Sequence, residues 1–388
     1  MKMRRILALI LCIALLLVVI SGCRNTDDVI DDPDENGSDV SDPNGDADTS
    51  VVSGIDFEAA LTTFPPDTVM IRSGDLALTW ADLYVFLYRA VLNIVEAQGE
   101  DIDWSEEPVE GMTLAELALE YSTEEALSFL AYMYGIKANN LTLSGQDLAA
   151  FNDDINSIVE MYRSAEEFEK SLREEGGFYN FDVFENLLKV EYTIGHFIDS
   201  LYGDEGAGFP DERVAEFAEQ SGYMHAMHIL ILKPSEEEDE EDTSLEISEA
   251  ILELLNEYFD TDEFMNIFTE LMFEYSEDDG GLMEFPDGFL FREGEMPTEF
   301  YNAVSELEVG ELSGLVEEDY GFHIIIRLPI DYDAVPMSMY DEGNSRTLRQ
   351  VAAMEDFDLV RSEWFAGLDP EKTPEYLSLD IATIFKWH

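Results

Sequence analysis

Hydrophobic and polar positions divide this chain of 388 residues into regions of different periodicity. Residues 55–217 carry apolar side chains every three to four positions, a spacing typical of amphipathic helices. Two later segments, 223–232 and 322–328, are continuous or alternating apolar runs of strand length. Helix-like sequence and glycine turns lie between these two runs, and the pattern therefore predicts a helical region followed by a smaller region built on a sheet.

Local signals add detail to the helical region. Capping residues mark three predicted helix starts: Thr79, Thr113 with Glu116, and Ser164 with Glu167. Helix breaks are predicted near Gly135 and Asn140, and further helices over about 182–201 and 346–365.

The first 22 residues have the form of a secretory signal. Cations at Lys2, Arg4 and Arg5 precede an apolar core over residues 6–20, which is short for a membrane span. The end of this segment, with Cys23 after Ser-Gly, resembles the bacterial lipobox, which implies cleavage before Cys23 and lipidation of its thiol. A plain signal peptide followed by an incidental cysteine is the alternative. Cleavage of the signal would remove Cys12 and leave Cys23 as the one cysteine of the mature chain. Disulfides and cysteine-based sites are therefore not expected.

Residues 23–54 are predicted to form an extended acidic tether, because they hold ten acidic residues and no aromatic ones. The sequence from Asp32 to Gly37 matches the opening of a calcium loop. The twelfth position of that loop requires a bidentate glutamate and is Pro43 here, so we expect no specific calcium site.

Charge excludes two classes of partner. The formal net charge is −67 and becomes about −70 when the three cations of the signal are removed. Such a surface repels nucleic acid and anionic lipid headgroups. Hydrophobic residues make up 46% of the chain and aromatic residues 12%, which is enough to build folded cores.

Strand geometry constrains the histidines in the sheet region. Residues three apart in a strand point to opposite faces, so His225 and His228 are not expected to share a metal ion. If the strands 223–232 and 322–328 are neighbours, His228 and His323 can meet on one face and form a hydrogen-bonded pair in an apolar cleft. No metal and no cofactor are expected.

Short motifs between residues 228 and 325 resemble, in the same order, those of the parvulin family of peptidyl-prolyl cis/trans isomerases. The motifs are HIL at 228–230, YSED at 275–278, GEMPTEF at 294–300, GELS at 310–313 and YGFHII at 320–325. The resemblance covers about 110 residues and implies prolyl isomerase activity.

The resemblance also implies roles for individual residues. Its catalytic positions fall on His228, Asp278 and His323, with Asp279 as an alternative to Asp278. Its proline-binding positions fall on Met296, Phe300 and Phe291. Each residue also has a purely structural interpretation: the histidines, Met296 and Phe300 as core, and Asp278 as a cap of a turn.

Residues 280–291 depart from the family pattern. The leucine expected in the pocket could be Leu282 or Leu290, or be absent. After the first strand, residues 236–242 are all acidic where phosphate-directed parvulins carry a basic cluster, so selection for phosphorylated substrates is not expected.

Outside this segment, residues 70–75 and the helix after them resemble the opening of SurA- and PrsA-type chaperone domains. The resemblance implies an α+β fold, in which a mostly helical chaperone domain contains an inserted parvulin-like domain with a four-stranded antiparallel sheet flanked by helices. The predicted parts are 1–22 (signal), 23–54 (tether), 55–217 (N-terminal helical domain), 218–332 (isomerase domain) and 333–388 (C-terminal helices that complete the helical domain).

Together these features predict a PrsA-type foldase anchored through Cys23 to the outer face of a bacterial cell membrane. Its partners would be unfolded or newly secreted polypeptides, held in an apolar-lined helical bowl, and homodimerisation is open. A holdase with an inactive parvulin fold is the first alternative. A solute-binding lipoprotein is the second, but residues 55–215 lack the alternation of strands and helices that it requires.

Overall fold

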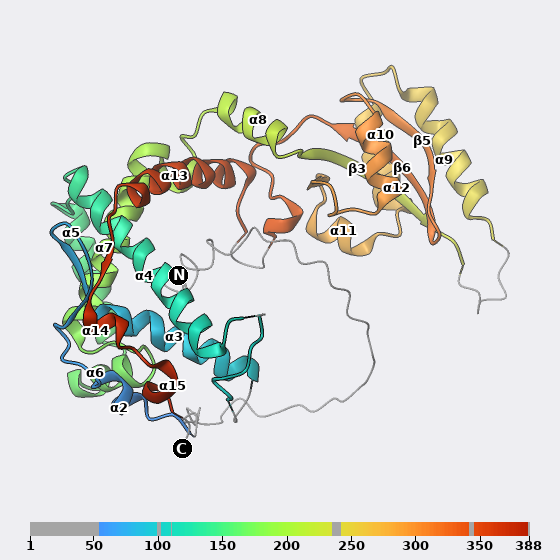
Figure 1. Cartoon of the computed structure of the whole chain (residues 1–388). Helices are drawn as coiled ribbons and strands as arrows, with labels where there is room; N and C mark the ends of the chain where they lie inside the picture. Colours follow the sequence, from blue (N-terminus) through green and yellow to red (C-terminus); the bar gives the residue numbers. More distant parts are fainter. Residues whose placement is uncertain (1–53, 99–101, 110, 235–241, 341–344, 387–388) are drawn as a thin grey trace. The chain divides into compact units, whose positions relative to one another are not determined.

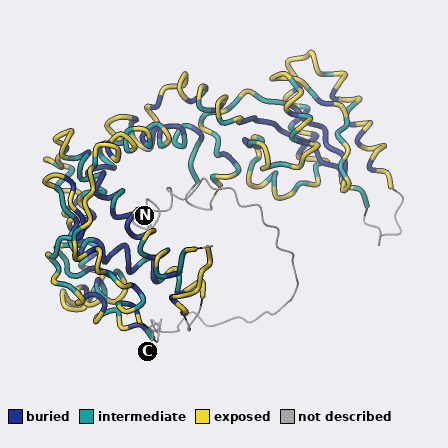
Figure 2. Tube along the Cα trace, in the orientation of Figure 1, coloured by how far each residue is buried: buried dark blue, intermediate teal, exposed yellow. Residues whose placement is uncertain are grey.

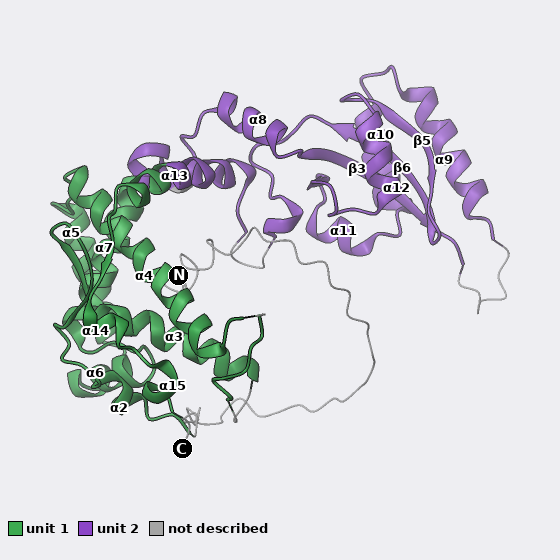
Figure 3. Ribbon diagram, viewed as in Figure 1, with its two compact units in different colours: residues 1–197, 360–388 green, residues 198–359 purple. Residues whose placement is uncertain are grey.

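The computed structural model describes residues 54–98, 102–109, 111–234, 242–340 and 345–386. The chain divides into two compact units, which are coloured in Figure 3. Unit 1 comprises the residues up to 197 and those from 360 onward, and unit 2 comprises residues 198–359. The predicted signal, the lipobox at Cys23 and nearly all of the acidic tether lie outside the described residues.

Unit 1 is mainly helical (Figure 1). Its elements are α2 (Phe57–Leu61), β1 (Val69–Ser73), β2 (Leu76–Thr79), α3 (Trp80–Gln98), α4 (Leu114–Ala138), α5 (Gln146–Val159), α6 (Ala165–Glu174), most of α7 (Phe181–Tyr202), the end of α13 (Leu348–Ala366), β7 (Glu371–Lys372), α14 (Pro374–Leu377) and α15 (Ile381–Ile384). The three strands form one sheet in the order β2-β1-β7. β7 pairs antiparallel with β1, with Ile71 opposite Lys372, so segments that precede and follow unit 2 in the sequence share a sheet.

The predicted helix starts are confirmed. Thr79 precedes α3 and accepts a hydrogen bond from the backbone N–H of Asp82. Thr113 and Glu116 form the complete capping box of α4. Ser164 caps α6 by accepting from the backbone N–H of Glu167, whose carboxylate in turn accepts from the N–H of Arg163 rather than of Ser164.

The predicted break near Gly135 is wrong, because α4 runs through this position to Ala138. A Cβ atom at Gly135 would lie 2.3 Å from the indole ring of Trp364, so glycine here allows close packing rather than ending the helix. The break near Asn140 is confirmed: α4 ends beside Asn140, whose φ of 52° is in the left-handed region.

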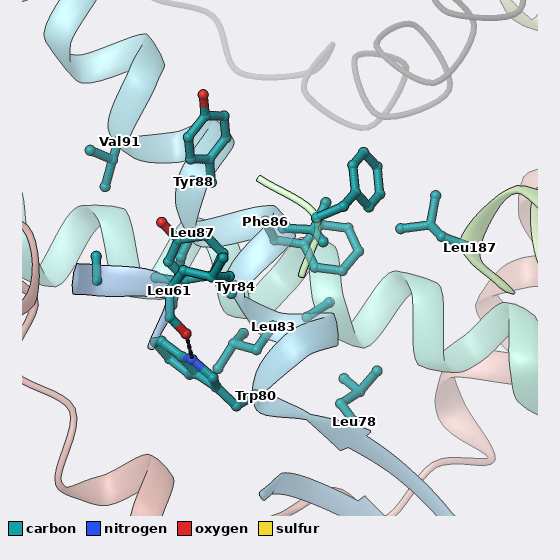
Figure 4. Packing of buried hydrophobic residues seen from close by; sticks show 14 of the residues in the cluster. Leu61, Leu78, Trp80, Leu83, Tyr84, Phe86, Leu87, Tyr88, Val91 and Leu187 are labelled. Carbon is teal, nitrogen blue, oxygen red and sulfur yellow. Dashed lines mark hydrogen bonds between the residues drawn. The ribbon is translucent and has the colours of Figure 1, made fainter. Parts of the chain in front are cut away.

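The core of unit 1 is built around α3. Trp80, Tyr84 and Leu87 are almost completely buried there, and the indole N–H of Trp80 donates to the carbonyl of Leu61 at 2.7 Å (Figure 4). This bond satisfies the polar atom of a large buried ring, as packing in a dry core requires.

Unit 2 contains the second sheet. Its elements are the 3-10 turn η2 (Asp204–Gly206), α8 (Asp211–Gln220), β3 (Met224–Leu232), α9 (Ser244–Tyr258), α10 (Phe264–Tyr275), α11 (Asp279–Glu284), β4 (Phe289–Phe291), α12 (Thr298–Glu306), β5 (Leu312–Glu317), β6 (Gly321–Leu328), the 3-10 turn η3 (Met337–Met339) and the start of α13. The strands are antiparallel in the order β4-β3-β6-β5.

Helices cover both faces of this sheet. On one face, α9 and α10 pack over Met227, Ile229 and Ile324. On the other face, α12 brings Phe300 and Val304 against the strands. Both central strands are therefore buried along most of their length, which explains their nearly continuous apolar sequences (Figure 2).

The predicted fold class is confirmed: the chain is α+β, with a mainly helical unit and a four-stranded antiparallel sheet flanked by helices. None of the helices within the described residues is both long enough and apolar enough to cross a bilayer.

Candidate active site

The two central strands of unit 2 bring the predicted histidines together. β3 and β6 pair antiparallel, with His228 opposite Ile325 and Leu230 opposite His323. Residues directly opposite in a sheet share a face, as do residues two apart in a strand. His228 and His323 are therefore diagonal neighbours on one face, and their ring centroids lie 5.1 Å apart.

The two imidazoles do not form the hydrogen-bonded pair that the sequence suggested. Among the described residues each ring has its own partner instead. His228 Nε2 lies 2.9 Å from Oδ2 of Asp278, and His323 Nε2 lies 3.1 Å from the hydroxyl of Tyr320. A direct bond is absent because the rings are diagonal neighbours inclined by 48°, each with its Nε2 turned to its own partner.

Asp278 has a structural role and a role in this site at the same time. Its Oδ1 accepts from the backbone N–H of Gly281 at 3.0 Å and caps α11, while its Oδ2 contacts His228. A Cβ atom at Gly281 would lie 2.3 Å from Oδ2, so glycine at this position leaves room for the carboxylate. The alternative, Asp279, makes no hydrogen bond to either imidazole within the described part of the chain.

Aromatic rings form the floor below the histidines. Phe300 is completely buried, and its ring stands edge-on to both imidazoles, at 5.3 Å from His228 and 5.4 Å from His323. Phe291 is also completely buried and lies 5.7 Å from Phe300. Met296 is half-buried against the same cluster, so the structure brings all six predicted site residues to one region.

Two further residues belong to this site and were not predicted. Tyr320 binds His323, and the ring of Phe289 lies 5.3 Å from that of His228. The sequence contained a signal for each: Tyr320 opens the YGFH motif, and Phe289 is two positions before Phe291 on the same strand.

Burial and neighbouring charges shift the pKa values of two groups in the site, His323 and Asp278. His323 is 2% exposed, and this burial, together with the adjacent His228, lowers the pKa of His323 to about 4, although Asp278 opposes the shift. The hydrogen bond from His228 lowers the pKa of Asp278. A carboxylate only accepts hydrogen bonds, so His228 presents a protonated Nε2 to Asp278. The Nδ1 atoms of both rings are buried and have no partner among the described residues.

A small cavity adjoins His228 and Asp278. Its volume is about 10 Å³, roughly enough for one water molecule. Leu282 lines this cavity, whereas Leu290 is opposite His225 and points to the other face of the sheet. Of the two candidates for the pocket leucine, only Leu282 lies at the site.

His225 is separate from this site. Its Nδ1 lies 2.9 Å from the carbonyl oxygen of Pro329. His225 and His228 occupy opposite faces of β3, as strand parity requires.

Comparison with known proteins supports the resemblance. Residues 228–328 match the family model of the rotamase, PPIC-type PPIase domain. This range includes the six predicted site residues, His228, Asp278, Phe291, Met296, Phe300 and His323. The parvulin resemblance is thereby confirmed for this segment. The chain is similar to two curated proteins named foldase protein PrsA. It is 45% identical over 58 residues to that of Geobacillus kaustophilus, and 28% identical over 191 residues to that of Halalkalibacterium halodurans.

These alignments are partial. The first covers 15% of this chain and 21% of the Geobacillus protein, and the second covers 46% and 52%. The chain thus spans about half the length, or less, of the curated relatives that it matches. Among solved structures, the peptidylprolyl isomerase PrsA of Bacillus cereus is similar over 82% of this chain and 98% of its own, at 16% identity and a TM-score of 0.31.

Proposed function

We propose that this protein is an extracytoplasmic foldase that catalyses cis/trans isomerisation of X-Pro peptide bonds in secreted polypeptides. The observation that carries the proposal is the convergence of His228, Asp278 and His323 over the buried ring of Phe300. The family match over residues 228–328 and the foldase names of the relatives support it.

The reaction requires selective binding rather than bond breaking. Amide resonance gives the peptide bond a rotation barrier of ~18–20 kcal/mol. A catalyst lowers this barrier by binding the twisted bond, in which resonance is lost, more tightly than either planar form. Neither a nucleophile nor a cofactor is needed for this.

Each side chain then has a role that fits its position. Met296, and Phe300 once the side chains that cover it move aside, would hold the proline ring in an apolar setting, which removes water that stabilises the planar amide. His323 is neutral at pH 7 and would present an uncharged polar group near the carbonyl, with His228 beside it. Asp278 fixes the orientation of His228 by accepting from its Nε2.

Selection for phosphorylated substrates is not part of the proposal. Lys233, directly after β3, is paired with Glu317 at 2.9 Å, and its Nζ lies 4.9 Å from the centre of the Phe322 ring. This cation is therefore already engaged by its own chain. The acidic segment that follows it would also repel a phosphate group.

The remaining parts of the proposal come from sequence. Lipidation at Cys23 would anchor the chain to the outer face of a bacterial cell membrane, with residues 23–54 as the tether. The helical parts, 55–217 and 333–388, would hold unfolded polypeptides around the isomerase part, 218–332. Homodimerisation through the helical parts is open.

One observation favours a second function, a holdase without turnover. The cavity beside His228 and Asp278 is smaller than a proline ring, and Phe300 is completely covered. A prolyl residue would therefore have to lie over the exposed edge of the site, near Tyr320 and Met296, or displace side chains as it binds.

Single substitutions in β3 test the proposal. We expect His228→Ala to lower the isomerisation rate of a proline peptide by about 10-fold or more, because the site loses the ring that Asp278 orients. The measurement is the catalysed cis-to-trans rate with the full-length chain.

His225→Ala is the matched control, since His225 and His228 are both 5% exposed on the same strand but face opposite sides. We expect it to leave the rate within about twofold of wild type. Equal losses in the two variants would contradict the assignment of the site.

A further inference from the structure

Unit 1 contains a cavity that the isomerase site does not explain. Its volume is about 440 Å³, which lies within the usual range of small-ligand pockets. Aromatic rings line it from several segments, among them Phe86 of α3, Tyr162 after α5, Phe168 of α6 and Phe184 of α7. Figure 4 shows Phe86 and Tyr88 on α3.

Charged side chains also border this cavity, among them Arg89 from α3 and Glu125 from α4. Glu125 is 5% exposed. Nη1 of Arg89 and Oε2 of Glu125 are shielded from solvent, and neither atom has a hydrogen-bond partner among the described residues. Burial raises the pKa of Glu125 to about 7 and lowers that of Arg89.

A purely structural role explains this pair poorly. Buried charges in a stable core normally form ion pairs or hydrogen bonds, because a buried polar group without a partner costs about 1–3 kcal/mol. No ion pair within 4 Å joins Arg89 to Glu125 or to any other carboxylate in the described part of the chain. The free protein therefore bears a desolvation cost that a suitable ligand would relieve.

Four other polar side chains at the cavity are already engaged. The hydroxyl of Tyr88 donates to the carbonyl of Glu174, and the hydroxyls of Tyr162 and Ser171 are 3.1 Å apart. The carboxylate of Glu175 accepts from Ser171 at 2.7 Å. Asn93 and Tyr121 also line the cavity, but Arg89 and Glu125 are the lining residues that carry a buried polar atom without a partner in the described part of the chain.

Charge selects among ligand types. An anionic group beside Arg89 would also face the carboxylates of Glu125, Glu175 and, nearby, Glu191. A cationic group beside Glu125 would face Arg89. A neutral group that accepts on one side and donates on the other matches both residues, and the peptide unit is such a group.

We propose that this cavity binds one residue of an extended client polypeptide, with a large aromatic or aliphatic side chain between the rings. The peptide carbonyl of that residue accepts from Arg89, and a peptide N–H donates to Glu125. The inference rests on the proposed function, because it specifies the clients as chains with exposed large apolar residues. Proline is not required at this site.

Proline-free peptides separate this site from the isomerase site. Two fluorescein-labelled decapeptides of glycine and serine, one with a central phenylalanine and one with alanine, are titrated with the full-length chain in lipid nanodiscs. Dissociation constants come from fluorescence anisotropy, with empty nanodiscs as the blank. We expect the phenylalanine peptide to bind about 10-fold tighter than the alanine peptide.

Three variants test the residues. Arg89→Met and Glu125→Leu should each abolish most of this preference, and the melting temperature of each variant is measured beside its affinity as a check on folding. Asn93→Trp, at an exposed edge of the cavity, should block binding without changing the buried pair. Glu120→Gln, exposed on the same helix as Glu125, is the matched control and should bind like wild type.

The inference is overturned if wild type binds both peptides equally, or if the Arg89 and Glu125 variants bind the phenylalanine peptide like wild type. A second result would also overturn it: the Arg89 and Glu125 variants lose binding of the phenylalanine peptide only because they unfold, and the folded Asn93→Trp variant still binds that peptide. A failure of the proposed isomerase function would appear instead as absent turnover on proline peptides, which this titration does not measure.

Discussion

Asp278 shows how one residue can combine stability and chemistry. Its two oxygens point to different partners, the N-terminus of α11 and the imidazole of His228. A substitution that removes the carboxylate would thus affect the helix and the site together. His228→Ala is the more selective test of the site, because it leaves the cap of α11 intact.

The buried His323 makes stability depend on pH in a defined window. An unfolded histidine has a pKa of about 6.5, and the folded value is about 4. Between these values the unfolded chain binds more protons than the folded one, so stability is complete above about pH 6.5 and is lost as the pH falls towards 4. The full loss would be at most about 3 kcal/mol.

Hydrogen exchange of the β3 and β6 amides measures this effect. We expect the free energy of opening to fall as the pH is lowered from 7 to 4.5, after correction for intrinsic exchange. His323→Asn is the control and should show a smaller dependence. A dependence in wild type that the variant fully retains would contradict the assignment to His323.

At the scale of elements, two helical glycines differ in their surroundings. A Cβ atom at Gly135 in α4 would meet the indole of Trp364 at 2.3 Å, whereas Gly195 in α7 has no atom within 4 Å of that position. Glycine inside a helix lowers stability unless close packing requires it.

Alanine at these two positions should therefore have opposite effects. We expect Gly135→Ala to destabilise unit 1 by about 1–3 kcal/mol through overpacking, and Gly195→Ala to stabilise the chain by about 0.5–1 kcal/mol. Denaturant unfolding of the two variants beside wild type measures both. Equal effects of the two substitutions would show that helix propensity alone determines the change in the free energy of unfolding, without a contribution from the packing against Trp364.

Features that depend on residues close together in the sequence could be predicted well. Features that depend on packing between distant parts of the chain could not. Capping residues located the starts of α3, α4 and α6 because each cap is a local bond. Strand parity placed His228 and His323 on one face because side chains alternate along any strand. The sequence could not show that Gly135 packs against Trp364, or that β7 pairs with β1, since hundreds of residues separate these partners.

The site shows the same division. Ordered motifs identified His228, Asp278, His323, Phe300, Phe291 and Met296, and the structure brings them to one region. Motifs gave no distances, so the separate partners of the two imidazoles and the small size of the cavity came only from the structure. Arg89 and Glu125 had no sequence signal, because only helix packing brings them to one cavity.

For the whole molecule, the net charge of −67 is a destabilising term that salt can reduce. Screening shortens the Debye length from about 10 Å at 0.1 M to about 3 Å at 1 M. We expect the melting temperature of the full-length chain to rise over this range of potassium chloride. A midpoint that stays constant or falls would show that like charges are too far apart to oppose folding.

The central claim is that the site over Phe300 turns over X-Pro bonds rather than only holding them. Exchange NMR on a proline peptide, with the full-length chain present at about one part in a hundred, measures the rate of cis/trans interconversion directly. Uncatalysed exchange takes tens of seconds or longer. The account predicts faster interconversion with wild type and a rate close to the uncatalysed one with His228→Ala. An uncatalysed rate with folded wild type that still binds the peptide would contradict the isomerase assignment and leave a polypeptide-holding protein.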